Sequence, residues 1–374
     1  MAPWHDRAGA GRALARVSHA FSILIAALAF ALPGVATAGD VPTFAVDPSW
    51  PKQLPNNWIL GQVGGITVDW QGHVWVIHRP RSLTDDEKGA TLSPPRNECC
   101  VPAPAVMEFD SEGNLLQAWG GPGPGYDWPA NEHGIFVDPA GNVWLAGNGE
   151  KDHQILKFAR DGRFLLQIGK PASSGGDTDT RNLNRPADVR VDAPANELYV
   201  ADGYANHRVI VFDATTGAYK RHWGANGRPP GDASVKQFRN PVHCVRVSTD
   251  GLVYVCDRVN NRIQVFKKDG TFVEEFTLAT ATGGAGSVWD LDFSRDAAQS
   301  YLYVADGENN HVWMLSRASG KVLSRFGRSG RYAGQLHWIH NMAVDSRGNI
   351  YTAEVDNAKR VQKFLFQGLF PVTD

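Results

Sequence analysis

The stretch that decides the fold is Asn240-Pro241-Val242-His243-Cys244-Val245-Arg246-Val247, followed after four residues by Leu252-Val253-Tyr254-Val255-Cys256-Asp257-Arg258. Both runs are rich in valine, which favours β-strands, and the residues between them, Ser248-Thr249-Asp250-Gly251, are typical of a tight turn. The stretch therefore predicts two short antiparallel strands with a histidine at the start of the first.

The same pattern occurs six times along the chain. Most copies continue into a third strand, and then into a fourth that follows a short turn, as in residues 270–276. Six units of four antiparallel strands, repeated at roughly 40–60 residues, predict an all-β six-bladed propeller. The predicted blades cover residues 61–120, 133–169, 184–224, 240–276, 286–327 and 337–366.

Two further segments belong to this arrangement. Residues 42–47 precede the first blade, and pairing with the last blade would close the ring and remove two exposed sheet edges. Residues 80–104 lie inside the first blade and are too long for a plain turn. We expect them to form a loop over one face of the propeller, where sites are commonly built.

The N-terminal 38 residues are typical of a secretory signal peptide. Arginines 7, 12 and 16 precede an apolar run at residues 21–32, and Ala36-Thr37-Ala38 fits a cleavage site. An uncleaved anchor is the alternative, but the run is shorter than the ~20 residues that a membrane span needs. We expect a mature propeller at residues 39–374, exported to a periplasm or secreted, with no membrane span after cleavage. The formal net charge of −2 gives no electrostatic reason to expect a nucleic-acid partner.

The four cysteines do not suggest a disulfide-stapled scaffold, because they are few for a chain of 374 residues. Cys99 and Cys100 are sequence neighbours, and neighbouring cysteines rarely bond to each other. A regular hairpin register puts Cys244 opposite Val255, so that Cys244 and Cys256 point to opposite faces. On this register we expect no disulfide between Cys244 and Cys256.

One position of the repeat carries histidine in alternate blades. Aligned on the residue five positions before the Asp or Ser that ends the first strand, blades 1 to 6 have Gly64, His133, Ala187, His243, Trp289 and His340. The first strand of a propeller blade is the innermost, so three imidazoles from alternate blades would meet at the axis. Three nitrogen ligands with an open fourth position suit Zn²⁺. The alternative interpretation is that these are polar residues lining a water-filled channel. His337 is a weaker alternative ligand.

Three more polar residues follow second strands and should lie at the same end of the ring. They are Arg79, Tyr204 and Arg258. Taken singly, each would more often anchor a turn. Taken around three histidines, they predict a cationic pocket for a carboxylate, with Tyr204 as a proton-transfer group.

The repeats resemble the NHL-repeat family, and the chain from about residue 61 to 364 is similar to the catalytic domain of peptidyl-α-hydroxyglycine α-amidating lyases. The segments that carry this resemblance are Ile77-His78-Arg79, His133-Gly134-Ile135, Val200-Ala201-Asp202-Gly203-Tyr204, Pro241-Val242-His243, Cys256-Asp257-Arg258 and His340-Asn341. The resemblance implies a zinc site at His133, His243 and His340, a catalytic tyrosine at Tyr204 and active-site arginines at Arg79 and Arg258. It also implies a small-molecule or peptide substrate with a carboxylate, cleaved at a carbinolamide C–N bond to an amide and glyoxylate.

The chain departs from the family pattern at several positions. Trp338 replaces a methionine two residues before the last zinc histidine, and Ala205 replaces a disulfide cysteine. Asn341 replaces an aspartate that binds structural calcium, and an uncharged amide is a weaker donor. A calcium site would therefore depend on Asn341 together with the carbonyls of Ile66 and Ile135. The chain also lacks the copper monooxygenase domain that makes the hydroxyglycine.

Two other functions fit a propeller. NHL-type propellers can bind a partner protein or an envelope component without any catalysis, because fold alone does not determine function. A propeller lactonase is a third possibility, but that class generally uses calcium and carboxylate ligands, and the three histidines argue against it.

Overall fold

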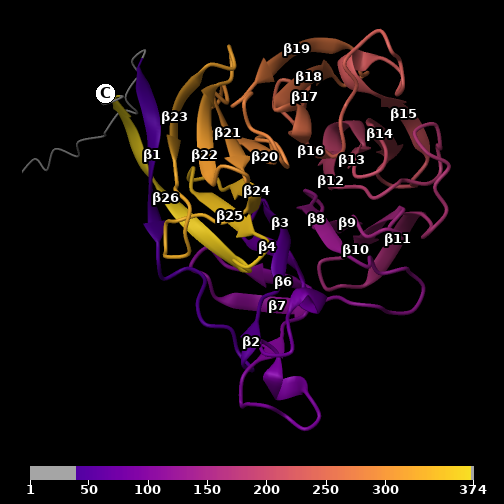
Figure 1. Ribbon diagram of the computed structural model, residues 1–374. Coiled ribbons are helices and arrows are strands. Elements are labelled where there is room, and N and C mark those ends of the chain that lie inside the picture. The colour runs from indigo at the N-terminus through magenta and orange to yellow at the C-terminus, as the bar shows by residue number, and fades with distance from the viewer. Residues whose placement is uncertain (1–38, 372–374) are drawn as a thin grey trace, which may run out of the picture. The chain divides into compact units, whose positions relative to one another are not determined.

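The computed structural model describes residues 39–371, so the predicted signal peptide lies outside the described residues. Six sheets, each of four antiparallel strands, follow one another around a ring from indigo to yellow (Figure 1). The prediction of an all-β six-bladed propeller is confirmed. Among the described residues no helix is long and apolar enough to cross a membrane.

The blades follow the sequence repeats in order. Blade 1 contains β3 (Gln62–Val68), β4 (Val74–Arg79), β6 (Val106–Phe109) and β7 (Leu115–Trp119). Blade 2 contains β8 (Glu132–Val137), β9 (Val143–Gly147), β10 (Gln154–Phe158) and β11 (Phe164–Gly169). Blade 3 contains β12 (Asp188–Asp192), β13 (Glu197–Asp202), β14 (Arg208–Asp213) and β15 (Tyr219–Trp223). Blade 4 contains β16 (Val242–Val247), β17 (Leu252–Asp257), β18 (Arg262–Lys267) and β19 (Phe272–Thr277). Blade 5 contains β20 (Asp290–Phe293), β21 (Tyr301–Asp306), β22 (His311–Ser316) and β23 (Val322–Phe326).

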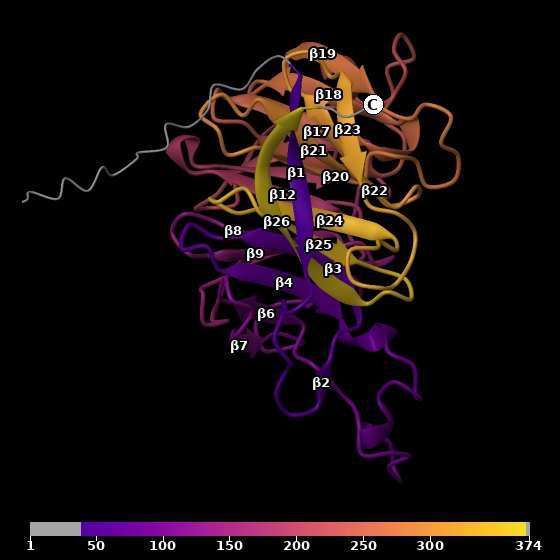
Figure 2. The same ribbon diagram turned by 90° about the vertical axis from the view of Figure 1, so that its left-hand side faces the viewer.

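Blade 6 is made from both ends of the described chain. It contains β24 (Ile339–Val344), β25 (Ile350–Glu354), β26 (Arg360–Pro371) and, as its outermost strand, β1 (Asp40–Asp47). The antiparallel pairing of β1 with β26 runs from Asp40 opposite Pro371 to Asp47 opposite Lys363 (Figure 2). The N-terminal strand thereby covers an edge of β26 that would otherwise be unpaired.

The repeat exists because each unit needs the same turn and the same inter-blade packing. In blade 2 the strand-ending Asp138 accepts backbone N–H groups of the following turn, at 3.0 Å from Ala140 and 2.9 Å from Asn142. Asp69 and Asp345 do the same in blades 1 and 6. A carboxylate that bonds its own turn stabilises the hairpin. The faces between blades are apolar, so each blade is stabilised by its neighbours.

The innermost strands form a closed ring in which β3, β8, β12, β16, β20 and β24 contact one another in turn. In four of the six strands the first residues do not follow a regular register, whereas β12 and β20 pair regularly. The pairing with the second strand is interrupted by a bulge at Gly64, at His133 and Gly134, at His243 and at His340. A bulge leaves a residue unpaired and redirects its side chain.

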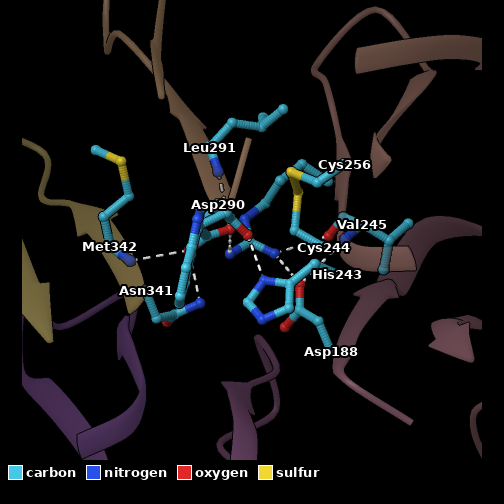
Figure 3. Close-up of a disulfide and its surroundings, with 11 residues drawn as sticks. Asp188, His243, Cys244, Val245, Cys256, Asp290, Leu291, Asn341 and Met342 are labelled. Atoms are coloured by element: carbon cyan, nitrogen blue, oxygen red, sulfur yellow. Dashed lines mark hydrogen bonds and ion pairs between the residues drawn. A yellow bond between two sulfur atoms is a disulfide. The ribbon is translucent and has the colours of Figure 1, made fainter. Parts of the chain in front are cut away.

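The turn after β16 corrects the prediction for the cysteines. The N–H of Ser248 bonds the carbonyl of Leu252 at 2.9 Å and Val247 lies opposite Val253, so the register differs by one residue already at the turn, and Cys244 lies opposite Cys256 rather than opposite Val255. The two cysteines form a disulfide with their Cα atoms 4.9 Å apart, close to Asp290 (Figure 3). The expectation of no disulfide was wrong because it treated all of residues 248–251 as an unpaired loop.

Residues 80–104 leave the ring of blade 1 as an excursion near the label β2 in Figure 2. The excursion includes two 3-10 turns, η1 (Pro80–Ser82) and η2 (Gly89–Thr91), and a short strand, β5 (Val101–Pro102), which pairs in parallel with β2 (Trp58–Ile59). Cys99 and Cys100 are joined by a disulfide, contrary to the expectation for neighbouring cysteines. Lys359 ties the excursion to blade 6 through the carboxylate of Glu87, at 2.8 and 2.6 Å.

Candidate metal centre

Three imidazoles converge at the amino ends of the innermost strands. His133, His243 and His340 come from β8, β16 and β24, each at a bulge. Their ring centroids lie 4.5 to 5.0 Å apart, and one ring nitrogen of each lies within 4.8 Å of the others. The structure therefore brings together all three histidines that the sequence selected.

The odd-numbered blades orient the histidines through backbone carbonyls. Nδ1 of His133 lies 2.7 Å from the carbonyl oxygen of Ala187, and Nδ1 of His340 lies 2.8 Å from that of Gly64. Nδ1 of His243 bonds the carbonyl of Trp289 in the same way. A carbonyl only accepts, so Nδ1 carries the proton and Nε2 keeps its lone pair. Each histidine is thus held by the aligned residue of the next blade.

Burial keeps these imidazoles neutral. All three side chains are almost fully buried. Burial lowers the pKa of His133, His243 and His340 well below the ordinary value of 6.5, and the neighbouring positive charges add to this effect. Neutral imidazoles fixed by a carbonyl at Nδ1 are the form that binds zinc, so these residues fit the metal.

Tyr204 faces two of the three histidines. Its hydroxyl lies 3.0 Å from Nε2 of His133 and 3.1 Å from Nε2 of His243. A side chain at Gly203 is excluded, because its Cβ would lie 2.0 Å from the carbonyl oxygen of Val242. This close approach of β13 to β16 brings Tyr204 beside His243.

The two arginines lie in the same pocket as Tyr204. Arg258 donates from Nη1 to the Tyr204 hydroxyl at 3.3 Å, and its guanidinium lies over the ring of Trp289, 4.3 Å from the centroid. Arg79 donates to the carbonyl of Glu132 at 2.8 Å and to Gln62 at 2.8 Å, and burial lowers its pKa. All residues selected as catalytic from the sequence therefore surround the histidines.

The pocket has a volume of about 360 Å³ and includes residues that sequence reasoning missed. Its lining consists of Gln62, Arg79, Asn148, Tyr204, Arg258, Trp289, Trp338, His340, Val355 and Asp356. Trp289 and Trp338 form an edge-to-face pair at 5.2 Å. The repeat alignment could have indicated Trp289, which occupies the aligned position of blade 5. Asn148 and Asp356 lie in loops that carry no repeat signal.

The other histidines have structural roles. His337 bonds Asp356 at 2.9 Å, and His78, quoted above for the family resemblance, bonds the carbonyl of Pro104 at 3.0 Å. His207 bonds Asp177, and His153 accepts two backbone N–H groups. A second group of possible ligands, Asp69, His73 and Glu108, already holds the guanidinium of Arg160.

The proposed calcium ligands do not fit that ion. The side-chain oxygen of Asn341 accepts the N–H of Ile66 at 2.8 Å, and its amide donates to Asp290 at 2.6 Å. Arg246 lies between Asp290 and Asp188 and bonds both, so a guanidinium already supplies positive charge there. Ile66 and Ile135, whose carbonyls were the other expected ligands, lie on neighbouring innermost strands. We derive no calcium chemistry for this chain.

Comparison with known proteins agrees with the fold. The model of the NHL repeat matches residues 183–212 and 240–266. The chain is a six-bladed NHL-repeat propeller. Streptogramin B lyase, a solved structure, covers 87% of this chain with a TM-score of 0.53 and 14% identity, which supports the fold alone; the alignment takes in 98% of that chain.

Two curated relatives align over most of the propeller. Peptidyl-alpha-hydroxyglycine alpha-amidating lyase 1 of Drosophila melanogaster is 28% identical over 87% of this chain, which spans 60% of that protein's length. NHL repeat-containing protein 3 of Mus musculus is 27% identical over 87% of this chain, which spans 84% of that protein. The chain is therefore similar both to amidating lyases and to a propeller whose name states no activity.

Proposed function

We propose that this propeller is an exported zinc-dependent lyase that cleaves the C–N bond of a carbinolamide to an amide and glyoxylate. The observation that carries the proposal is the set of three neutral imidazoles, each fixed at Nδ1 by a carbonyl of the next blade, facing the hydroxyl of Tyr204. His133, His243 and His340 would hold the zinc. When bound, the ion supplies Lewis acidity to a substrate oxygen.

The residues around the histidines can carry out the proton transfer that the reaction needs. The hydroxyl proton of the carbinolamide passes to the oxygen of Tyr204, which Arg258 holds through a hydrogen bond of 3.3 Å. As the C–N bond breaks, its electron pair goes to nitrogen, and the nitrogen takes up the proton that Tyr204 gives from its own hydroxyl, so the tyrosine ends as it began. The products are the amide and the aldehyde of glyoxylate, so atoms and electrons balance.

The carboxylate end of the substrate would bind the arginines. Arg79 and Arg258 both line the pocket, so their guanidiniums can donate to an incoming carboxylate. A guanidinium offers two parallel N–H groups to a carboxylate. Trp289 and Trp338 give the same pocket an apolar wall for the group on the amide side. A small molecule or a peptide end with an apolar residue before the hydroxyglycine matches this lining.

The metal content of the purified protein is the first test. We expect about one zinc per chain and release of glyoxylate from an N-acyl-α-hydroxyglycine. Tyr204→Phe should keep the zinc and lose about 10²–10⁴-fold in rate, the range for a lost proton-transfer group. Zinc binding without any glyoxylate release would refute the reaction and keep the metal centre.

The second candidate is a non-catalytic propeller that binds a protein or envelope component. The similarity to NHL repeat-containing protein 3, of which the chain spans 84%, favours this candidate. The two candidates differ in the metal, because a binding scaffold does not need it. A protein that is purified without stoichiometric transition metal, and that takes up none, would support the scaffold.

Export is tested separately. The proposal predicts that a mature chain beginning near Gly39 accumulates outside the cytoplasm. N-terminal sequencing of the protein from cell fractions measures this directly. A cytoplasmic chain that retains residues 1–38 would refute export without affecting the metal centre.

A further inference from the structure

A second cavity lies at the other end of the innermost strands. Its volume is about 270 Å³, and each of the six innermost strands or the turn that follows it contributes to the lining. The lining consists of Thr67, Val68, Phe136, Arg190, Arg246, Val247, Thr249, Asp292, Phe293, Arg295, Gln299, Ala343 and Val344. Thr249 and Arg295 are exposed, so the cavity is open to solvent. The histidines are at the amino ends of these strands, so the two sites are at opposite mouths of the ring.

Two of the three arginines in this cavity are paired. Arg246 bonds the carboxylates of Asp188 and Asp290. Arg295 bonds Asp292 at 3.1 Å and the carbonyl of Val344. These two guanidiniums and three carboxylates are in direct contact, and their hydrogen-bonding capacity is largely used.

Arg190 is different. Its guanidinium makes no hydrogen bond within residues 39–371, and no carboxylate oxygen of that range lies within the 4.0 Å of a salt bridge. Its Nε is buried, and so is the Nε of Arg246, which also lacks a partner. The guanidinium lies over the ring of Phe136, 4.5 Å from the centroid, which leaves its edge free to donate.

Arg190 is partly exposed, and a guanidinium without a hydrogen-bond partner can donate its N–H groups to a ligand. Burial, with the charge of Arg246 nearby, lowers the pKa of Arg190 to about 10, so the group is still charged at neutral pH. The carboxylates of Asp188, Asp290 and Asp292 also act on this charge, which favours a monovalent anion over a divalent one. Val68, Phe136 and Phe293 offer apolar surface to an organic body.

We propose that this cavity binds a small organic monocarboxylate, with its carboxylate on Arg190 and its apolar part against Phe136 and Phe293. The site is separate from the candidate metal centre and does not depend on the proposed reaction. A carboxylate takes two N–H groups of one guanidinium, which Arg190 can provide from its two terminal nitrogens.

Calorimetric titration of the purified protein with isobutyrate at fixed ionic strength tests the proposal. We expect one saturable site that depends on Arg190 and is at least about tenfold weaker in Arg190→Met, since a lost charged partner costs that much or more. Arg181→Met, which removes an exposed arginine outside the cavity, is the matched control and should bind isobutyrate as the wild type does. Arg258→Met removes a guanidinium from the metal-centre pocket and should also leave this binding unchanged.

Three results would overturn the proposal. They are the absence of saturable binding, equal binding by Arg190→Met, and binding that Arg258→Met abolishes and Arg190→Met does not. Saturation by inorganic phosphate with no response to isobutyrate would also overturn the assigned ligand class. Arg190 has no partner to lose, so Arg190→Met should keep the thermal midpoint of the wild type. If it does not fold, Arg190→Lys, which retains the charge but loses the two-pronged donor, should fold and bind more weakly.

Discussion

The two mouths of the ring are built from the same six strands, and only one of them carries the three histidines. At the amino ends, His133, His243 and His340 are neutral and present lone pairs. At the carboxyl ends, the functional groups are guanidiniums. Between them is a layer made of Arg246, Asp188, Asp290 and Asn341, which we call the axial layer. Figure 3 labels Asp188, Asp290 and Asn341 of this layer. The bulges create the first mouth, and regular strand geometry creates the second.

This difference shows how one strand can serve two sites. A residue at the bulge lies outside the ladder, so its side chain reaches the axis while the next blade's carbonyl orients it. Residues farther along follow the alternation of the strand, and both short and long side chains line the second cavity, from Ala343 to Arg190. Substitutions at one mouth should therefore leave the other intact.

The largest expected effect is a loss of zinc affinity at the amino mouth. His243→Ala should lower zinc affinity by more than about 100-fold, because even partners outside the ligand set contribute 10–100-fold. Glyoxylate release should be lost with the metal, whereas isobutyrate binding at the carboxyl mouth should stay. Zinc content and calorimetry on the same preparation measure both.

His207→Ala is the matched control for that variant. It removes a histidine that bonds Asp177 on the outer part of blade 3, so zinc content should not change. Retention of stoichiometric zinc by His243→Ala would contradict the three-histidine centre.

The next largest effect is expected on the free energy of unfolding, for a substitution in the axial layer. Arg246→Met leaves Asp188 and Asp290 buried without their cation, and breaking such a pair lowers the free energy of unfolding by about 3–5 kcal/mol. Arg295→Met is the control, because its pair with Asp292 is partly exposed and should contribute only about 0–1 kcal/mol. Urea unfolding measures both. Equal losses in the two variants would mean that the axial layer does not stabilise the ring.

The fold could be predicted because its signal is repeated. The turn aspartates and valine-rich strands recur in every part of the chain, and each copy supports the others. The metal centre could be predicted for the same reason, since three of its residues share one aligned position. The carbonyls of Gly64, Ala187 and Trp289 also share that position, but a backbone group carries no sequence signal.

What could not be predicted depends on departures from regularity. The pairing of Cys244 with Cys256 follows from a one-residue difference of register at the turn, where Ser248 bonds Leu252, and the turn residues alone do not show where the ladder ends. The axial layer depends on residues from blades 3, 4, 5 and 6 that approach one another only after the ring closes. The isolation of Arg190 is likewise a property of the assembled cavity.

Loss of the disulfide between Cys244 and Cys256 should have a smaller effect on stability, and it should also weaken zinc binding at the amino mouth. Replacing Cys244 and Cys256 by alanine should lower the free energy of unfolding by about 3 kcal/mol, the value for closing a loop of this length. Because Cys244 follows His243, zinc affinity should fall too, though by less than tenfold, since the carbonyl of Trp289 still holds the imidazole. Replacing Cys99 and Cys100 by serine is the control: that bond closes no loop, so its loss should change stability by less than about 0.5 kcal/mol.

The smallest expected effect is the pH dependence of zinc binding. Three imidazoles with the ordinary pKa of 6.5 would lose roughly 70-fold in affinity between pH 8 and pH 6, because protons compete for the nitrogens. Burial lowers the pKa of all three well below 6.5, so the folded site has no proton to displace at pH 6. Competition with a chromophoric chelator should show a change of less than about threefold across this range. A 70-fold loss would mean that the imidazoles are solvated.

The lowered pKa values of the three histidines and the raised pKa of Asp290 have opposite effects on how the stability of the metal-free protein depends on pH. As pH falls below 6.5, the histidines of the unfolded chain bind protons, whereas the buried histidines of the folded protein do not. Their titration therefore makes the folded state less stable at low pH. Burial raises the pKa of Asp290 in the axial layer to about 7, so the folded state binds that proton more readily than the unfolded chain. Its contribution is present at low pH and is lost as pH rises from about 4 through about 7. Asp290→Asn removes this contribution, so unfolding of the metal-free variant should become more sensitive to acid than that of the wild type, and an unchanged profile would mean that Asp290 is already ionised.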